Sequence, residues 1–176
     1  MRTIRIITIL IATLAVAAVI AALSMGGKWQ VQASQQINAP AQEVFPYINT
    51  LKKWPEWTVW NKTNHPNLQM TYEGADAGRG AVQIWHEGDD KGRLEIINSE
   101  PHQFIEYTLN MGLFLINGRI SLTESPQGTV VTWTQEGDNG SNLIARLMTL
   151  IFKPMMKKDL TEGLNNLQQL FSQRPT

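Results

Sequence analysis

The strongest constraint on the fold is a series of short segments with strand-like alternation that fills the middle of the chain. Apolar and polar residues first alternate over Trp29 to Ile37, as in a strand with one buried face. Further segments follow between Leu68 and Glu136, separated by turns rich in glycine, aspartate and proline, and Asn117-Gly118 is a strong signal for a two-residue turn. These segments are Met70 to Glu73, Ala81 to Glu87, Arg93 to Ser99, Phe104 to Met111, Arg119 to Glu124 and Thr129 to Glu136. The series predicts a highly curved antiparallel sheet of about seven strands in meander order.

Helical patterns flank the series on both sides. Apolar residues of Ala41 to Leu51 have helical spacing, and the tryptophan-rich stretch Trp54 to Trp60 follows, so two short helices are expected after the first strand. A long helical pattern covers residues 141–171, with Ser141 as the expected N-cap, and Pro154 inside it predicts a kink or a break. Because a curved sheet of this size cannot fill its concave face with its own side chains, the long helix is expected to cover that face.

The N-terminus carries a separate signal. The basic opening MRTIR precedes an uncharged apolar run from Ile6 to Leu23, a pattern typical of a secretory signal or of a single membrane-spanning helix. The run is long for a signal peptide, so we expect a signal anchor over residues 1–26 and one domain over residues 27–176 on the extracytoplasmic side. Cleavage at Ala22-Leu23-Ser24, which would leave a secreted or periplasmic domain, and a soluble hydrophobic helix are the alternatives.

Charge and cysteine content argue against several classes of function. The chain has 15 basic and 15 acidic residues and no cysteine. Every acidic residue follows Leu23, so residues 27–176 carry a net charge of about −2, and binding to nucleic acid is not expected. The lack of cysteine excludes disulfides, a thiolate nucleophile and cysteine-ligated zinc. His86 to Asp90 combines an imidazole with carboxylates but fits a solvated hairpin turn better, so no metal and no cofactor is expected.

Several short motifs occur in an order that is typical of one fold. They are Ile37, Ala39, Pro40, Val44 and Phe45 at the start of the first helix, then Trp54, Pro55, Trp57 and Trp60, then Gly78, Gly80 and Trp85, then Gly128, Thr129, Val131 and Trp133, and finally Gly163, Leu164 and Leu167. With these motifs, residues 29–172 resemble the SRPBCC or START-like superfamily, whose fold is the helix-grip fold of the birch pollen allergens, and most of all its polyketide cyclase/dehydrase-like branch. The resemblance implies an α+β fold with a long C-terminal helix over the concave face of the sheet. It implies less about function, because lipid carriers, hormone receptors, cyclases and co-chaperones share this fold.

The space between the sheet and the long helix is the candidate ligand site. The methionines on the apolar side of the helix are either ordinary packing or the adaptable lining of a cavity, and one alternate set of residues from each strand should face them. The residues expected to line the cavity are Trp60, Ile84, Ile96, Tyr107, Leu109, Trp133, Met148, Ile151, Phe152 and Met155. Trp54 and Trp57 are expected to lie largely in the core.

Three functions stay open from the sequence. The first is membrane-anchored binding or carriage of a small hydrophobic or amphipathic molecule in this groove. A polyketide cyclase/dehydratase-like enzyme and a structural or protein-interaction module with a filled core are the others. No catalytic residue is assigned, because the sequence places no nucleophile, no metal site and no acid/base pair. Glu106 is a candidate cavity acid/base, but the alternation of Ile105, Tyr107 and Leu109 favours a solvent-facing Glu106. Oligomeric state is not predicted.

Overall fold

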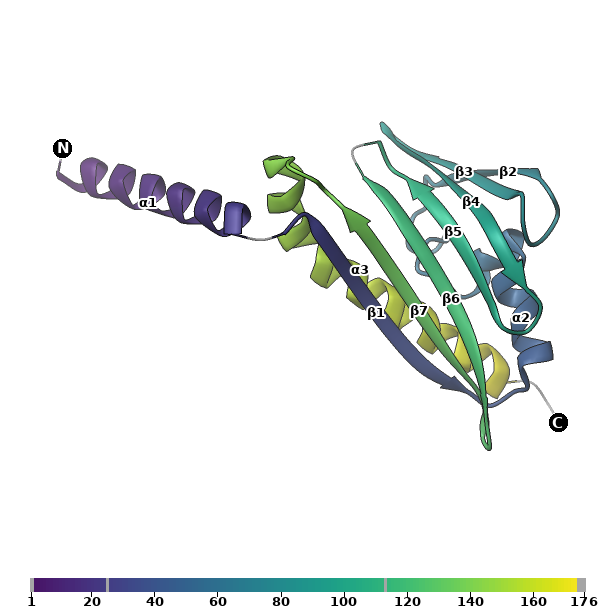
Figure 1. Ribbon diagram of the computed structural model, residues 1–176. Helices are drawn as coiled ribbons and strands as arrows, with labels where there is room; N and C mark the ends of the chain where they lie inside the picture. Colours follow the sequence, from purple (N-terminus) through teal and green to yellow (C-terminus); the bar gives the residue numbers. More distant parts are fainter. Residues whose placement is uncertain (1, 25, 113, 174–176) are drawn as a thin grey trace.

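One antiparallel sheet, with helices against its concave face, makes up the domain that follows the N-terminal helix (Figure 1). The computed structural model describes residues 2–24, 26–112 and 114–173. The elements are α1 (Arg2–Ser24), β1 (Lys28–Ile37), α2 (Ala41–Asn49), the 3-10 helix η1 (Leu51–Glu56), β2 (Gln69–Gly74), β3 (Ala81–Glu87), β4 (Asp90–Glu100), β5 (Phe104–Asn110), β6 (Leu115–Ser125), β7 (Gly128–Asp138) and α3 (Leu143–Ser172). The strand order β1-β7-β6-β5-β4-β3-β2 confirms the predicted seven-stranded antiparallel sheet. It also shows that β1 pairs with β7, at the end of the meander.

A tryptophan cluster fills the interior where η1 meets the sheet. Trp54 and Trp57 are buried, as expected, and each ring packs against Trp133 of β7 with centroids 5.7 and 5.2 Å apart. The indole nitrogens donate hydrogen bonds to backbone carbonyls of α2, from Trp54 to Ile48 at 2.9 Å and from Trp57 to Tyr47 at 3.1 Å. These contacts join α2 and η1 to the sheet as one core.

The long helix α3 is unbroken, and its two halves have different surroundings. In residues 159–172, the packed half, the side chains of Leu160, Leu164 and Leu167 are fully buried against the core. In residues 143–158, the open half, most large apolar side chains are exposed to solvent. Both halves have helical spacing of apolar residues, so the sequence pattern alone does not distinguish them.

The structure corrects two details of α3. The helix continues through Pro154 without a break, so the predicted division into two segments is wrong. Leu150, whose carbonyl loses its partner to the proline, is exposed, so water can satisfy that group. The N-cap is Asn142 rather than Ser141, because the Asn142 side chain accepts a hydrogen bond from the backbone N–H of Ala145 at 3.1 Å.

Glycines face aromatic rings across neighbouring strands of the sheet. Tyr107 pairs with Gly118, and a Cβ atom added to Gly118 would lie 2.0 Å from the Tyr107 ring. Trp85 with Gly92 and Trp29 with Gly137 repeat the arrangement. The turn predicted at Asn117-Gly118 is therefore wrong. Both residues lie inside β6, and the glycine makes room for the tyrosine ring rather than for a bend.

The N-terminal helix also differs from the sequence prediction. Within the described residues, no helix is long and apolar enough to cross a membrane. The predicted transmembrane helix and the predicted single-pass membrane localisation are therefore wrong. A spanning helix takes about 20 consecutive, predominantly apolar residues. The uncharged run of α1 begins only after Arg5 and contains Thr8 and Thr13, whose hydroxyls donate to the carbonyls of Ile4 and Ile9 at 2.9 and 2.8 Å.

Candidate functional site

A small pocket lies on the concave face of the sheet, beside the tryptophan cluster. We call it the sheet pocket, and its volume is about 90 Å³. Its lining residues come from η1, the loop that follows it, and strands β2 to β5 and β7: Trp54, Thr58, Trp60, Leu68, Met70, Gln83, Trp85, Leu94, Tyr107, Leu109, Met111, Trp133 and Gln135. None of these residues carries a charge, so the pocket favours apolar atoms and neutral polar groups.

Tyr107 is the centre of the polar part of this pocket. Its hydroxyl oxygen accepts hydrogen bonds from Trp133 Nε1 at 2.8 Å and from Gln135 Nε2 at 2.9 Å. Burial raises the pKa of Tyr107 to about 12, although the two hydrogen bonds oppose the rise. The phenol is therefore neutral at physiological pH. Within the part of the chain that the structure describes, no partner accepts the proton of this hydroxyl, so it is available to a ligand.

Gln83 supplies a second unsatisfied group. Its side chain is only 6% exposed, and its Nε2 makes one weak contact, a hydrogen bond to the Met70 sulfur at 3.5 Å. Among the described residues, Gln83 Oε1 has no hydrogen-bond partner. A buried amide oxygen without a donor is energetically costly, which makes this atom a polar anchor for a ligand in the pocket.

Strand register decides which side chains reach the pocket. Gln83 on β3, Leu94 on β4 and Leu109 on β5 lie opposite one another in one row across the sheet. Ile84 pairs with Arg93 in the next row, so it lies on the opposite face and lines an outer groove. At this step of β3, Gln83 points inward although it is polar, and Ile84 points outward although it is apolar, which reverses the usual alternation.

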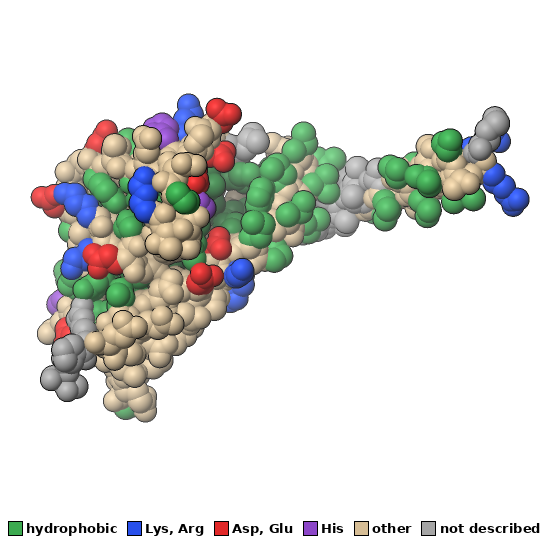
Figure 2. Space-filling model, turned by 180° about the vertical axis from the view of Figure 1, so that it is seen from behind, with side chains coloured by type: hydrophobic (Ala, Val, Ile, Leu, Met, Phe, Trp, Pro, Cys, Tyr) green, Lys and Arg blue, Asp and Glu red, His purple; other side chains and the backbone are tan. Residues whose placement is uncertain are grey.

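The pocket mouth continues into exposed apolar surface. Met111, directly after β5, lines the pocket and is half exposed. Phe114 follows it and packs edge-to-face on Phe152 of α3, with ring centroids 6.0 Å apart. On the same open half of α3, Ile151 is 68% and Met155 is 55% exposed. Figure 2 shows apolar side chains gathered along this part of the molecule, between the body of the domain and α1, with a hollow beside them.

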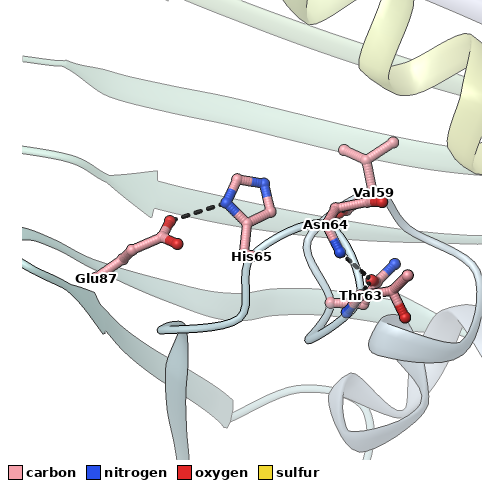
Figure 3. Close-up of polar contacts among 6 residues, drawn as sticks. Val59, Thr63, Asn64, His65 and Glu87 are labelled. Carbon is pink, nitrogen blue, oxygen red and sulfur yellow. Dashed lines mark hydrogen bonds and ion pairs between the residues drawn. The ribbon is translucent and has the colours of Figure 1, made fainter.

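The loop between η1 and β2 brings Trp60 to the pocket and is fixed by polar contacts (Figure 3). His65 Nδ1 lies 2.8 Å from Glu87 Oε2 and so joins the loop to the end of β3. Asn64 Nδ2 donates to the carbonyl of Val59 at 2.9 Å, which closes the loop on itself. The wall of the pocket that Trp60 forms is therefore held in place by the fold.

The structure brings together only part of the predicted lining. Trp60, Tyr107, Leu109 and Trp133 line the sheet pocket. Ile96 is fully buried outside it, and Ile84 lies on the opposite face. The α3 residues are apart from the pocket lining: Met148 is partly buried, whereas Ile151, Phe152 and Met155 are exposed on the open half.

Sequence reasoning missed the polar pocket residues other than Tyr107, which are Thr58, Gln83 and Gln135, and several apolar ones, among them Met70 and Trp85. Gln135 carried a signal, because it lies two residues after Trp133 on the same face of β7. Gln83 carried none, because an isolated glutamine beside an apolar isoleucine predicts an outward side chain.

Glu106 lies outside the pocket. Its carboxylate pairs with Arg119 and accepts a hydrogen bond from Asn98 Nδ2 at 3.2 Å, while its neighbours Ile105 and Tyr107 are buried. The expected solvent-facing orientation is therefore correct. Within the described residues, no cluster of three or more histidine, aspartate and glutamate side chains could hold a metal ion.

Comparison with solved structures shows the same fold in several bacterial proteins. A protein of Rhizobium leguminosarum is 14% identical, with a TM-score of 0.58 and alignment over 84% of this chain and 96% of that protein. A protein of Mesorhizobium loti is 17% identical, with a TM-score of 0.58 over 84% and 100% of the two chains. DynU16, from the dynemicin biosynthetic locus, is 15% identical, with a TM-score of 0.58 over 82% of this chain and 47% of its own. At these identities the likeness shows the fold alone.

Sequence comparison adds the family. No curated protein matches the chain. The family model described as polyketide cyclase / dehydrase and lipid transport matches residues 28–172, which covers every strand of the sheet and all of α3.

Proposed function

Because the chain belongs to the polyketide cyclase/dehydrase and lipid transport family, we propose that residues 27–176 bind a small hydrophobic or amphipathic molecule between the sheet and the open half of α3. The observation that carries the proposal is an uncharged pocket that opens beside exposed apolar side chains. Monomeric proteins seldom expose contiguous apolar surface without a binding role.

The ligand would contact two sets of residues. Trp60, Tyr107, Leu109 and Trp133 would form the inner set, because they line the sheet pocket. The outer set would be the exposed apolar side chains of the open half, Ile151, Phe152 and Met155, together with the partly buried Met148. Affinity would come mainly from apolar burial, at about 25 cal/mol per Å² before the costs of association are subtracted.

The test is uptake of a neutral apolar dye, with a matched pair of variants. N-phenyl-1-naphthylamine fluoresces strongly in apolar surroundings and carries no charge, so one of its rings can enter the pocket while the rest lies on the apolar surface outside it. Leu109→Trp would fill the pocket and should weaken dye binding at least tenfold, whereas Ile84→Trp on the opposite face should leave it unchanged. Circular dichroism would check that both variants are folded.

Mass spectrometry of solvent extracts gives an independent readout. Protein purified without detergent should release a small apolar or amphipathic molecule, and the Leu109→Trp variant should release less of it. Repeated absence of any such molecule, together with no dye uptake by the unmodified protein, would overturn the proposal.

A cyclase-like enzyme is the second candidate, and Tyr107 is the observation that favours it. A neutral buried phenol with an available proton could donate a hydrogen bond to a carbonyl of a reactive chain and stabilise developing negative charge on its oxygen. A cyclisation activity that persists in Tyr107→Phe would exclude this role.

A further inference from the structure

We propose that the sheet pocket selects a ligand with an uncharged polar end that donates a hydrogen bond, such as an alcohol or a primary amide, on an elongated apolar tail, and that it discriminates against carboxylates. This inference rests on the proposed binding function and specifies its ligand class. The features that carry it are an unpaired acceptor, a polar lining without charge, and a volume too small for a whole ligand.

The unpaired acceptor defines the hydrogen-bonding group. Gln83 Oε1 is buried without a partner among the described residues, so a ligand N–H or O–H would remove the cost of its burial. Tyr107 lines the same pocket, and its hydroxyl has a proton to donate. A ligand hydroxyl matches both groups, because it can donate to Gln83 and accept from Tyr107.

The lining excludes charge. The pocket residues include no lysine, arginine or histidine that would neutralise a carboxylate. Gln83 and Gln135 are neutral, and burial keeps the Tyr107 phenol neutral as well. A carboxylate would therefore lose its hydration without gaining a cation. Tyr107 could donate to one of its oxygens, but the carboxylate has no proton to offer Gln83 Oε1, which would stay unpaired beside a negative charge.

The volume defines the shape of the ligand. About 90 Å³ is well below the 300–1,000 Å³ of common ligand pockets, so only the polar end and the first carbons of a ligand fit inside. Met111 is the most exposed of the lining residues, so the rest of the ligand would leave past its side chain. Beyond it, Phe114 and Phe152 continue the apolar surface to the open half of α3. An elongated tail covers this path better than a compact ring system.

Three ligands with an unbranched ten-carbon chain test the proposal: decan-1-ol, 1-methoxydecane and decanoate. Each would compete with N-phenyl-1-naphthylamine for the unmodified protein at neutral pH. We expect decan-1-ol to bind about tenfold more tightly than the ether, which cannot donate a hydrogen bond, and at least tenfold more tightly than decanoate. Since the ether is the more apolar of the two neutral ligands, hydrophobic transfer alone would give the opposite ranking.

Variants of Gln83 test whether this side chain causes the preference for the alcohol over the ether. Gln83→Leu should remove the preference for the alcohol over the ether while dye binding is retained. Gln69→Leu, an exposed glutamine on the neighbouring strand, should keep the preference. If Gln83→Leu does not fold, Gln83→Met retains the length of the side chain without the amide.

The outcomes separate this inference from the binding function. Decanoate binding as tightly as decan-1-ol, or an alcohol preference that persists in a folded Gln83 variant, would overturn the selectivity while dye uptake still supported a ligand pocket. Failure of the dye and of all three ligands to bind would overturn both.

Discussion

The two halves of α3 have the same kind of sequence pattern and opposite environments. In the packed half, Leu160, Leu164 and Leu167 are buried, and Gly163 lets the helix approach Trp133, since a Cβ atom there would lie 3.3 Å from that ring. In the open half, Ile151 and its apolar neighbours face solvent. One half of the helix stabilises the domain, and the other leaves apolar surface beside a pocket. Helical periodicity identifies the apolar side of a helix but not what covers it.

The largest expected contrast comes from matched truncations in the two halves. Leu164→Ala should lower the free energy of unfolding by about 2–5 kcal/mol, because it leaves a cavity in the core. Ile151→Ala, at a side chain that is 68% exposed, should change it by about 0.5 kcal/mol or less. Urea unfolding of both variants measures the difference. Equal losses would mean that the open half is packed in solution.

Unfolding at alkaline pH tests how burial of the Tyr107 phenol affects the stability of the domain. The pKa of Tyr107 in the folded protein, about 12, lies above its ordinary value of 10. The folded state therefore holds the phenolic proton more tightly than the unfolded state does. This difference contributes fully to the free energy of unfolding below pH 10, and the contribution is lost as the pH rises towards 12. Over this range the free energy of unfolding should fall by roughly 3 kcal/mol because of Tyr107.

The Tyr107→Phe variant, which lacks the phenolic proton, is the control for this fall in stability. The variant starts from lower stability, because Trp133 Nε1 and Gln135 Nε2 lose their acceptor, but its stability should fall less steeply between pH 10 and 12. Urea unfolding at intervals across this range measures both slopes. Parallel slopes would show that Tyr107 does not titrate in this way.

A small effect on stability is also expected for Phe152→Ala in the open half. The substitution removes one edge-to-face contact with Phe114 and should cost about 1 kcal/mol or less. It should nevertheless weaken binding of decan-1-ol several-fold if the tail lies along this surface. Ile97→Ala, at an exposed isoleucine in the β-bulge of β4, is the control that should leave binding unchanged.

Most of the sheet could be predicted from the sequence, because its strands alternate clearly and are separated by turn residues. Trp133 and Tyr107 illustrate this, since their inward direction follows from period two alone. The prediction failed where a local rule was overridden by a distant contact. Gly118 lies within a strand because the Tyr107 ring covers it, although Asn-Gly is a strong turn signal.

The pocket was harder to predict than the fold. Its apolar walls follow from alternation, but Gln83 points inward next to an outward Ile84, and only the pairing with Leu94 reveals this. For α3, helical spacing did not reveal which apolar side chains stay exposed, such as Ile151 and Phe152. Pocket position depends on the path of the backbone, and binary patterning does not encode that path.

The pairing of aromatic rings with glycines has a consequence for how the strands find their partners. A shift of β6 by two residues along β5 would keep every side chain on its proper face, so alternation does not oppose it. It would, however, bring Tyr107 opposite Ile116 or Ile120 instead of Gly118, and the ring would have no room. A two-residue shift between β3 and β4 would likewise set Trp85 against Leu94 or Asp90. Each ring over a glycine thus marks one alignment as correct among those that the hydrophobic pattern treats as equal.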